Sequence, residues 1–196
     1  MKKQNNFISA QIKKIKDSYV NIDPVKFIQT LKAFSKVFFI FSLMFVGAYI
    51  FKFFKIDVET TKHFKLILAD VNIFPLYKSY YTTFIFLITY EVIKISLIAA
   101  IFFYFIKFLN SMDINNPFKN IISKDYLFSV AIISSVFFTV DAISMMHLAY
   151  FQDLLPIEGN LRIFHFEYLF LAFFINVFAV IFKRGVDLNN ELDSVI

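Results

Sequence analysis

The stretch that decides the fold is residues 82–108, with the sequence TTFIFLITYEVIKISLIAAIFFYFIKF. Only Glu91, Lys94 and Lys107 carry a charge in this otherwise apolar run. A transmembrane helix needs about 20 predominantly apolar residues, and the run exceeds that length. We therefore expect it to cross a bilayer as a helix.

Three further runs have the same character, at residues 33–54, 126–148 and 163–182. Together the four runs predict an all-α, integral membrane four-helix bundle, formed by a single domain over residues 1–196. The segment Phe64–Leu68 is also apolar but too short to cross a bilayer. We expect it to form a small element within the loop between the first two spans.

The composition agrees with a membrane protein. Of the 196 residues, 59% are hydrophobic and 30 are Phe, which is more apolar surface than a soluble chain of this length can bury. The net charge of +5 does not indicate nucleic-acid binding, because the Lys residues lie beside apolar runs instead of forming one basic patch. The abundance of Phe, Ile, Lys and Asn is typical of proteins from AT-rich bacterial genomes.

Residues 1–22 precede the first span and are rich in Lys. Their apolar side chains recur at helical spacing: Ile8, Ile12, Ile15 and Tyr19. This pattern predicts an amphipathic N-terminal segment, which lies either on the membrane surface or against the rest of the protein. Asp23 and Pro24 then indicate a helix start, because Asp can cap free N–H groups and Pro suits the first helical turn.

The distribution of Lys and Arg predicts the orientation in the membrane. Thirteen of these residues lie on one side of the predicted bundle: eight Lys up to Lys36, three from Lys107 to Lys124, and Lys183 with Arg184. Six lie on the other side: five Lys from Lys52 to Lys78, and Arg162. Because cytoplasmic segments carry the excess of positive charge, we expect an inner-membrane protein with both termini in the cytoplasm.

Ionisable residues inside or near the spans are candidates for a functional site, because a charge inside a bilayer is costly. Six residues form this predicted intramembrane polar cluster: Glu91, Lys94, Asp141, His147, His165 and Glu167. Glu91 and Lys94 are three residues apart and share a helix face. One interpretation is an ion pair between helices, joining Lys94 to Asp141 or to Glu91; the other is a polar pocket for a proton, a cation or a small ligand.

No motif indicates an enzyme. The chain contains no Cys, which excludes a disulfide, an iron–sulfur cluster and a thiolate nucleophile. It also has no phosphate-binding loop, dinucleotide fingerprint, nucleophile elbow or HExxH sequence. His165 and Glu167 point to different sides of a helix, so they are poorly placed to share a metal ion. We expect no catalytic residue, no cofactor and no metal.

The segment after the fourth span has a pattern of its own. Lys183 and Arg184 can anchor the cytoplasmic end of the span, and Gly185 can end the helix in a left-handed conformation. Leu188, Leu192 and Ile196 then recur at helical spacing. We expect either a short amphipathic cytoplasmic helix, lying against loops or a partner, or a solvated tail.

Two strings in the chain resemble a bacterial membrane family catalogued as domain of unknown function 2975. The C-terminal string matches at Gly185, Leu188, Glu191, Asp193 and Ile196, and the loop string matches at Asn116, Pro117 and Phe118. Asn189 and Ser194 depart from the family pattern. The resemblance implies a small multi-pass membrane protein without an assigned reaction, whose gene often lies beside that of a helix-turn-helix regulator.

These observations favour a non-enzymatic membrane sensor, or a regulatory partner of a cytoplasmic helix-turn-helix protein. The alternative is a small transporter or channel component that uses the polar cluster. Four helices form a narrow bundle, so a pore would require a homo-oligomer.

Overall fold

The computed structural model describes residues 24–54, 65–66, 71–113, 118, 121–152 and 166–195. The predicted amphipathic segment at residues 1–22 lies outside this part of the chain. Four long helices dominate, and their bounds are α2 (Pro24–Phe54), α5 (Tyr81–Ser111), α6 (Ile121–Gln152) and α7 (Phe166–Val195). Each is long and apolar enough to span a membrane. The predicted all-α bundle is therefore confirmed.

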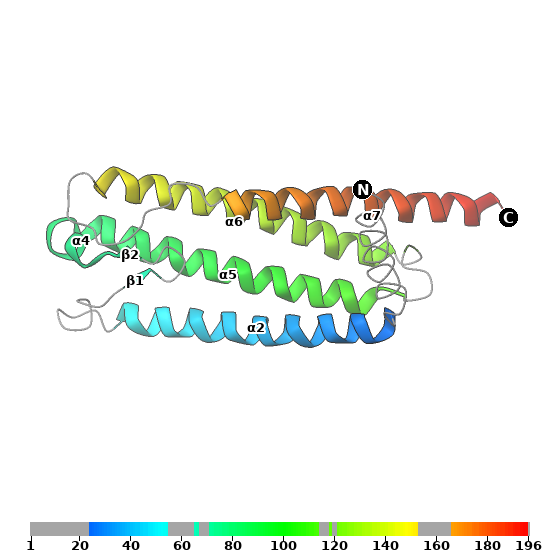
Figure 1. Cartoon of the computed structure of the whole chain (residues 1–196), viewed down its shortest axis with the longest axis horizontal. Coiled ribbons are helices and arrows are strands. Elements are labelled where there is room, and N and C mark those ends of the chain that lie inside the picture. Colours follow the sequence, from blue (N-terminus) through cyan, green and yellow to red (C-terminus); the bar gives the residue numbers. More distant parts are fainter. Residues whose placement is uncertain are drawn as a thin grey trace, which may run out of the picture.

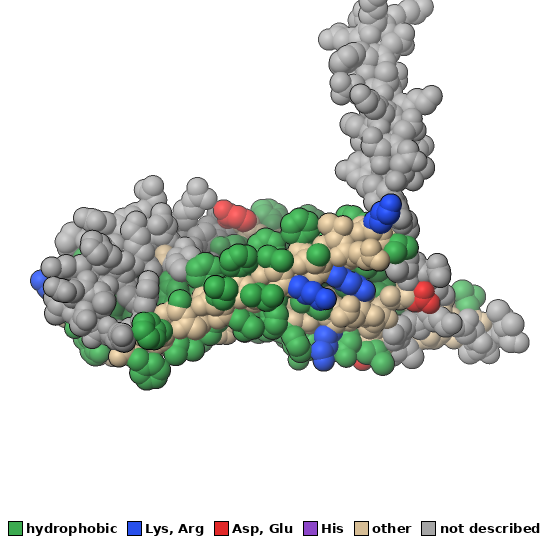
Figure 2. Space-filling model, turned by 90° about the horizontal axis from the view of Figure 1, so that it is seen from below, with side chains coloured by type: hydrophobic (Ala, Val, Ile, Leu, Met, Phe, Trp, Pro, Cys, Tyr) green, Lys and Arg blue, Asp and Glu red, His purple; other side chains and the backbone are tan. Residues whose placement is uncertain are grey.

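The four helices pack in the order of the chain (Figure 1): α2 lies on α5, α5 on α6 and α6 on α7. The central pair, α5 and α6, is consequently the most enclosed, while α2 and α7 flank it. Their outward faces consist of exposed Phe, Leu, Ile and Val side chains. Figure 2 shows that hydrophobic side chains cover much of one such face, as expected for helices surrounded by lipid.

Hydroxyl groups inside these helices satisfy their own hydrogen-bonding capacity. Ser35, Ser42, Ser96 and Ser134 each donate to the backbone carbonyl four residues earlier, at 2.7–2.8 Å. This local bonding hides a polar group without needing a partner from another helix. The spans can therefore contain Ser and still face a bilayer.

One end of the bundle, where α2 and α6 end and α5 begins, is called here the capped end. Two short strands, β1 (Lys65–Leu66) and β2 (Val71–Asn72), pair antiparallel beside it, with Leu66 opposite Val71. The six-residue helix α4 (Phe74–Ser79) follows them. Leu66, Ile73 and Leu76 are fully buried against α5 and its neighbours. The apolar run predicted as a small loop element thus supplies β1 and part of this cap.

The other end, where α2 and α6 begin and α5 finishes, is called the tail end, because α7 continues beyond it (Figure 1). The expected short helix after the fourth span does not exist as a separate element. Instead, α7 runs without interruption from Phe166 through Gly185 to Val195. The prediction that Gly185 ends the helix is wrong, and its neighbour Phe118 provides the reason, described below.

Candidate functional site: a buried charge cluster and a projecting helix

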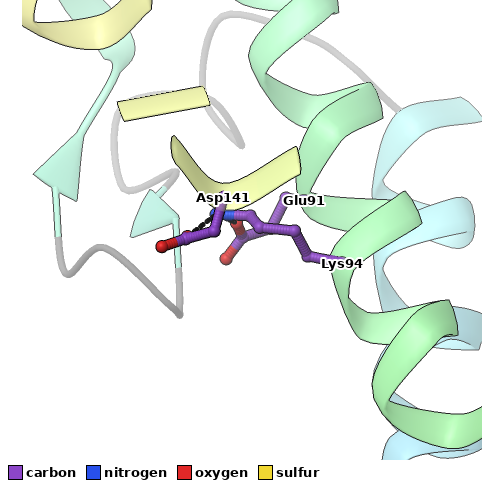
Figure 3. A network of polar contacts seen from close by, with 3 residues as sticks. All are labelled: Glu91, Lys94 and Asp141. Atoms are coloured by element: carbon purple, nitrogen blue, oxygen red, sulfur yellow. Dashed lines mark hydrogen bonds and ion pairs between the residues drawn. The ribbon is translucent and has the colours of Figure 1, made fainter. Parts of the chain in front are cut away.

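Three ionisable side chains meet between α5 and α6, near the capped end (Figure 3). Glu91 and Lys94 lie one turn apart on α5, and Asp141 faces them from α6. The Lys94 Nζ lies 2.9 Å from the Glu91 Oε2 and donates a hydrogen bond of 3.2 Å to the Asp141 Oδ1. All three side chains are buried. These three residues form the charge cluster.

The neighbours of the charge cluster keep water away. Leu87 and Ile88 precede Glu91 by about one turn and belong to the buried apolar group that closes the capped end. Ile95 follows Lys94 directly and belongs to the same group. Ions in such a place lose their hydration, so each depends strongly on its opposite charge. The cluster is therefore well suited to fix how α5 docks on α6.

The charge cluster contains more acidic than basic groups, since two carboxyl groups share one ammonium group. With all three groups ionised, the cluster carries one excess negative charge. A further polar atom lies one turn along α6: the Ser144 Oγ is buried and has no hydrogen-bond partner in the structure. Sequence analysis did not single out Ser144, because a lone Ser is ordinary in an apolar helix.

Two other members of the predicted polar cluster, His147 and Glu167, do not join these three. His147 lies on α6 among aromatic rings, with centroid distances of 5.7 Å to Phe151, 6.2 Å to Tyr90 and 6.5 Å to Phe86. Glu167 is exposed near the start of α7. His165 lies outside the described residues. Among the residues that the structure describes, no three His, Asp or Glu side chains gather in a group that could hold a metal ion.

At the tail end, the two strings that carry the family resemblance come into contact. The Phe118 ring packs on Phe182, with centroids 5.3 Å apart, and Phe182 contacts Phe108 at the same distance. A Cβ atom on Gly185 would lie only 2.6 Å from two carbons of the Phe118 ring. The Phe118 ring thus occupies the space of a side chain at Gly185, so this glycine serves close packing within a continuous helix and not a helix end.

The remaining motif residues are only partly described. Asn116, Pro117 and Ile196 lie outside the described residues, and the structure gives the helical backbone of Asp193 but not its side chain. Leu188 and Glu191 are exposed on α7.

Polar contacts tie α7 to α6, and sequence analysis did not identify them. The Asn176 Nδ2 donates to two acceptors on α6, the Ser135 Oγ at 2.9 Å and the Ala131 carbonyl oxygen at 3.4 Å. Within α7 it also donates to the Ala172 carbonyl oxygen at 2.8 Å. Lys124 forms an ion pair of 3.1 Å with Asp187. A lone Asn within a run of apolar residues was the available signal for the first contact. The second joins residues 63 positions apart, and nothing in the sequence pairs them.

The last turns of α7 present a mixed apolar and acidic surface. Val186 is fully buried, but Leu188 and Leu192 are 44% and 66% exposed. Glu191 is exposed on the same turns. Leu188, Glu191 and Leu192 form what we call the tail surface. It differs from the lipid-facing surface because an acidic residue lies beside its apolar side chains.

Together, the four spans and their buried polar contacts define a multi-pass membrane protein. Comparisons with protein-family models, with curated proteins and with solved structures give no match. The resemblance to the family of unknown function therefore stays a prediction that rests on the two sequence strings.

Proposed function

We propose that the protein is a non-enzymatic regulatory component of a bacterial inner membrane, acting through cytoplasmic contacts of the tail surface. The observation that carries the proposal is the continuity of α7. The same helix contacts α6 inside the bundle, through Asn176 and Asp187, and then presents Leu188 and Leu192 beyond it. A change in how α7 packs would therefore displace the tail surface.

The positions of the basic side chains support a cytoplasmic tail end. Among the basic side chains that the structure describes, Lys78 and the buried Lys94 lie at or near the capped end. Those toward the tail end are Lys26, Lys32, Lys36, Lys107, Lys124, Lys183 and Arg184. Figure 2 shows Lys and Arg side chains gathered mainly toward the end where α2 begins. Positive charge is enriched on the cytoplasmic side of membrane proteins, so this end faces the cytoplasm in our proposal.

The chemistry of the tail surface suggests its partner. Two exposed Leu side chains one turn apart suit an apolar groove, and Glu191 suits a basic rim around that groove. Proteins that bind nucleic acid carry basic surfaces. A cytoplasmic helix-turn-helix regulator, as the family resemblance implies, has the complementary charge. Binding to the tail surface would hold such a regulator at the membrane.

The alternative, a small transporter or channel component, has less support. Lys94 lies within contact distance of both carboxyl groups of the charge cluster. The cavity described below is lined by other residues. If the alternative were correct, reconstituted protein would show a flux that Asp141→Asn changes.

Site-specific photocrosslinking in the host cell tests the proposal. A photoreactive residue at Leu192 should capture a soluble protein, whereas the same residue at the lipid-facing Ile181 should not. Joint replacement of Glu191 and Asp193 by Ala should reduce the capture at least fivefold. Glu167→Ala is the matched control, since it removes an exposed acidic residue near the other end of α7. Equal capture at both positions, or capture unaffected by the paired replacement, would refute the proposal.

A further inference from the structure

A cavity of about 180 Å³ lies between α5, α6 and α7. Its lining includes Ile98 and Phe102 from α5, Phe137 from α6, and Tyr168 and Ala172 from α7. The helices explain its place: α5 and α7 each pack along α6, and they contact each other farther toward the tail end, where Phe108 packs on Phe182. The space between α5 and α7 is therefore closed on one side by α6.

The cavity lies near the middle of α5 and α6 and beside the first two turns of α7. Ile98 is about 26 Å along α5 from Tyr81 and about 20 Å from Ser111, at roughly 1.5 Å per residue. Phe137 lies about 24 Å along α6 from Ile121 and about 23 Å from Gln152 by the same rise. The hydrocarbon core of a bilayer is about 30 Å thick, so this depth corresponds to its centre. At that depth the surrounding medium consists of acyl-chain ends.

The side chains that line the cavity favour an apolar ligand. Almost all of it is aliphatic or aromatic, and the hydroxyl of Ser134, which also lines the cavity, already donates to the Val130 carbonyl oxygen at 2.8 Å. An apolar cavity of about 150 Å³ accommodates benzene, so this one holds about six or seven carbon atoms. Left empty, its walls would lack packing partners on one side.

We infer that this cavity is a binding site for the terminal part of an acyl chain of a membrane lipid. A thin, flexible chain fits a partly enclosed space of this size. A helix of a second copy, about 10 Å wide, does not. Only a single side chain of another copy could enter, and the test below includes that outcome.

Lipid binding at this site would also regulate the proposed function through the position of α7, and this part of the inference rests on that function. Tyr168, Leu171 and Ala172 line the cavity from α7, the helix that carries the tail surface. Occupancy would fix the distance between the first two turns of α7 and α6. Lipids with different chain ends would then position the tail surface differently.

Photolabelling of the full-length protein in lipid nanodiscs tests the site. The probe is phosphatidylglycerol with a diazirine near the end of one acyl chain, and labelled peptides are mapped by mass spectrometry. We expect residues 98–102 and 168–172 to be labelled at least fivefold more than the lipid-facing side of α2. Ala172→Leu, which fills the cavity, should reduce that labelling at least fivefold. The matched control Ala48→Leu, on the exposed side of α2, should leave it unchanged.

A second variant covers the case in which Ala172→Leu does not fold. Ile101→Ala enlarges the cavity and should raise the labelling about twofold. Labelling of the cavity peptides no stronger than that of α2, or a crosslink to a second copy in its place, would overturn the inference. The nanodiscs contain no cytoplasmic partner, so this result is independent of capture at Leu192. Failure of one experiment therefore leaves the other interpretable.

Discussion

Near the capped end, the three side chains of the charge cluster are buried between α5 and α6, whereas at the tail end the ion pair of Lys124 with Asp187 stays partly exposed. Lys94 contacts Glu91 and Asp141 with no solvent access. Lys124 and Asp187 form an ion pair of similar length, but their side chains remain 22% and 35% exposed. The same kind of contact therefore has different consequences at the two ends, because the surrounding medium differs.

The difference in exposure predicts which ion pairs are costly to break and which are not. A buried charge that loses its partner is strongly unfavourable, so the charge cluster resists any separation of α5 from α6. An exposed pair is worth about 0–1 kcal/mol and can break at little cost. The charge cluster thus holds α5 on α6, whereas the ion pair of Lys124 with Asp187 adds little to the docking of α7 on α6.

The largest expected effect follows from Lys94→Met. This change leaves two buried carboxyl groups without their ammonium group, and we expect a loss of about 3–5 kcal/mol in stability. Reversible unfolding of the purified protein in detergent measures it. The triple variant E91Q/K94M/D141N removes all charges together and should recover most of the loss. A Lys94→Met protein as stable as the wild type would show that the cluster does not hold the helices.

Gly185→Leu should have the next largest effect. The new side chain would occupy the space of the Phe118 ring, and overpacking of this kind costs about 1–3 kcal/mol. Gly47→Leu is the matched control, because no atom lies within 4 Å of a Cβ at that position. Phe118→Ala should restore the stability that Gly185→Leu loses, but it should not make the wild-type protein more stable. An equal response at both glycines would mean that the contact with Phe118 is unimportant.

Asn176→Leu should have a moderate effect. It removes the hydrogen bonds from the Asn176 Nδ2 to the Ser135 Oγ and to the α6 backbone. Hydrogen bonds between helices in membranes contribute about 0.6 kcal/mol on average and up to about 1.7 kcal/mol. Ser135→Ala in the Asn176→Leu background should add little. A larger second loss would indicate that Ser135 acts through other contacts.

The smallest effect concerns Lys124 and Asp187. A double-mutant cycle with Ala at both positions should give a coupling energy below about 1 kcal/mol, because the pair is partly solvated. Raising the ionic strength should weaken the coupling further. Strong coupling that does not depend on salt would place this pair in the same category as the charge cluster and remove the contrast between the two ends.

The sequence predicted the spans well, because hydrophobic runs of sufficient length have few alternatives to crossing a bilayer. The helices extend beyond the predicted runs, since polar residues can continue a helix outside the hydrocarbon. The spacing of Glu91 and Lys94 predicted that they share a face, and Asp141 was one of two expected partners for Lys94. The charge cluster contains both partners.

What the sequence could not predict depends on contacts between distant segments. Gly185 has the signature of a helix end, but its role is set by the Phe118 ring, which belongs to another part of the chain. His147 was grouped with the charges by depth alone. It instead lies beside Phe86 and Tyr90, because its direction around α6 differs from that of Asp141. Depth is readable from sequence position, whereas the direction in which a helix packs is not.

The proposed regulatory role depends on α7 being one helix that carries the tail surface out of the bundle. The chain contains no Cys, so single Cys residues can be introduced and spin-labelled one by one from position 180 to position 192. We predict that label mobility in the reconstituted protein follows a helical period of about 3.6 residues across the whole range. The lowest mobility should fall at Phe182 and Val186, which are buried. A period that stops at Gly185, with uniformly high mobility beyond it, would contradict the continuous helix and the proposed route from the membrane to the tail surface.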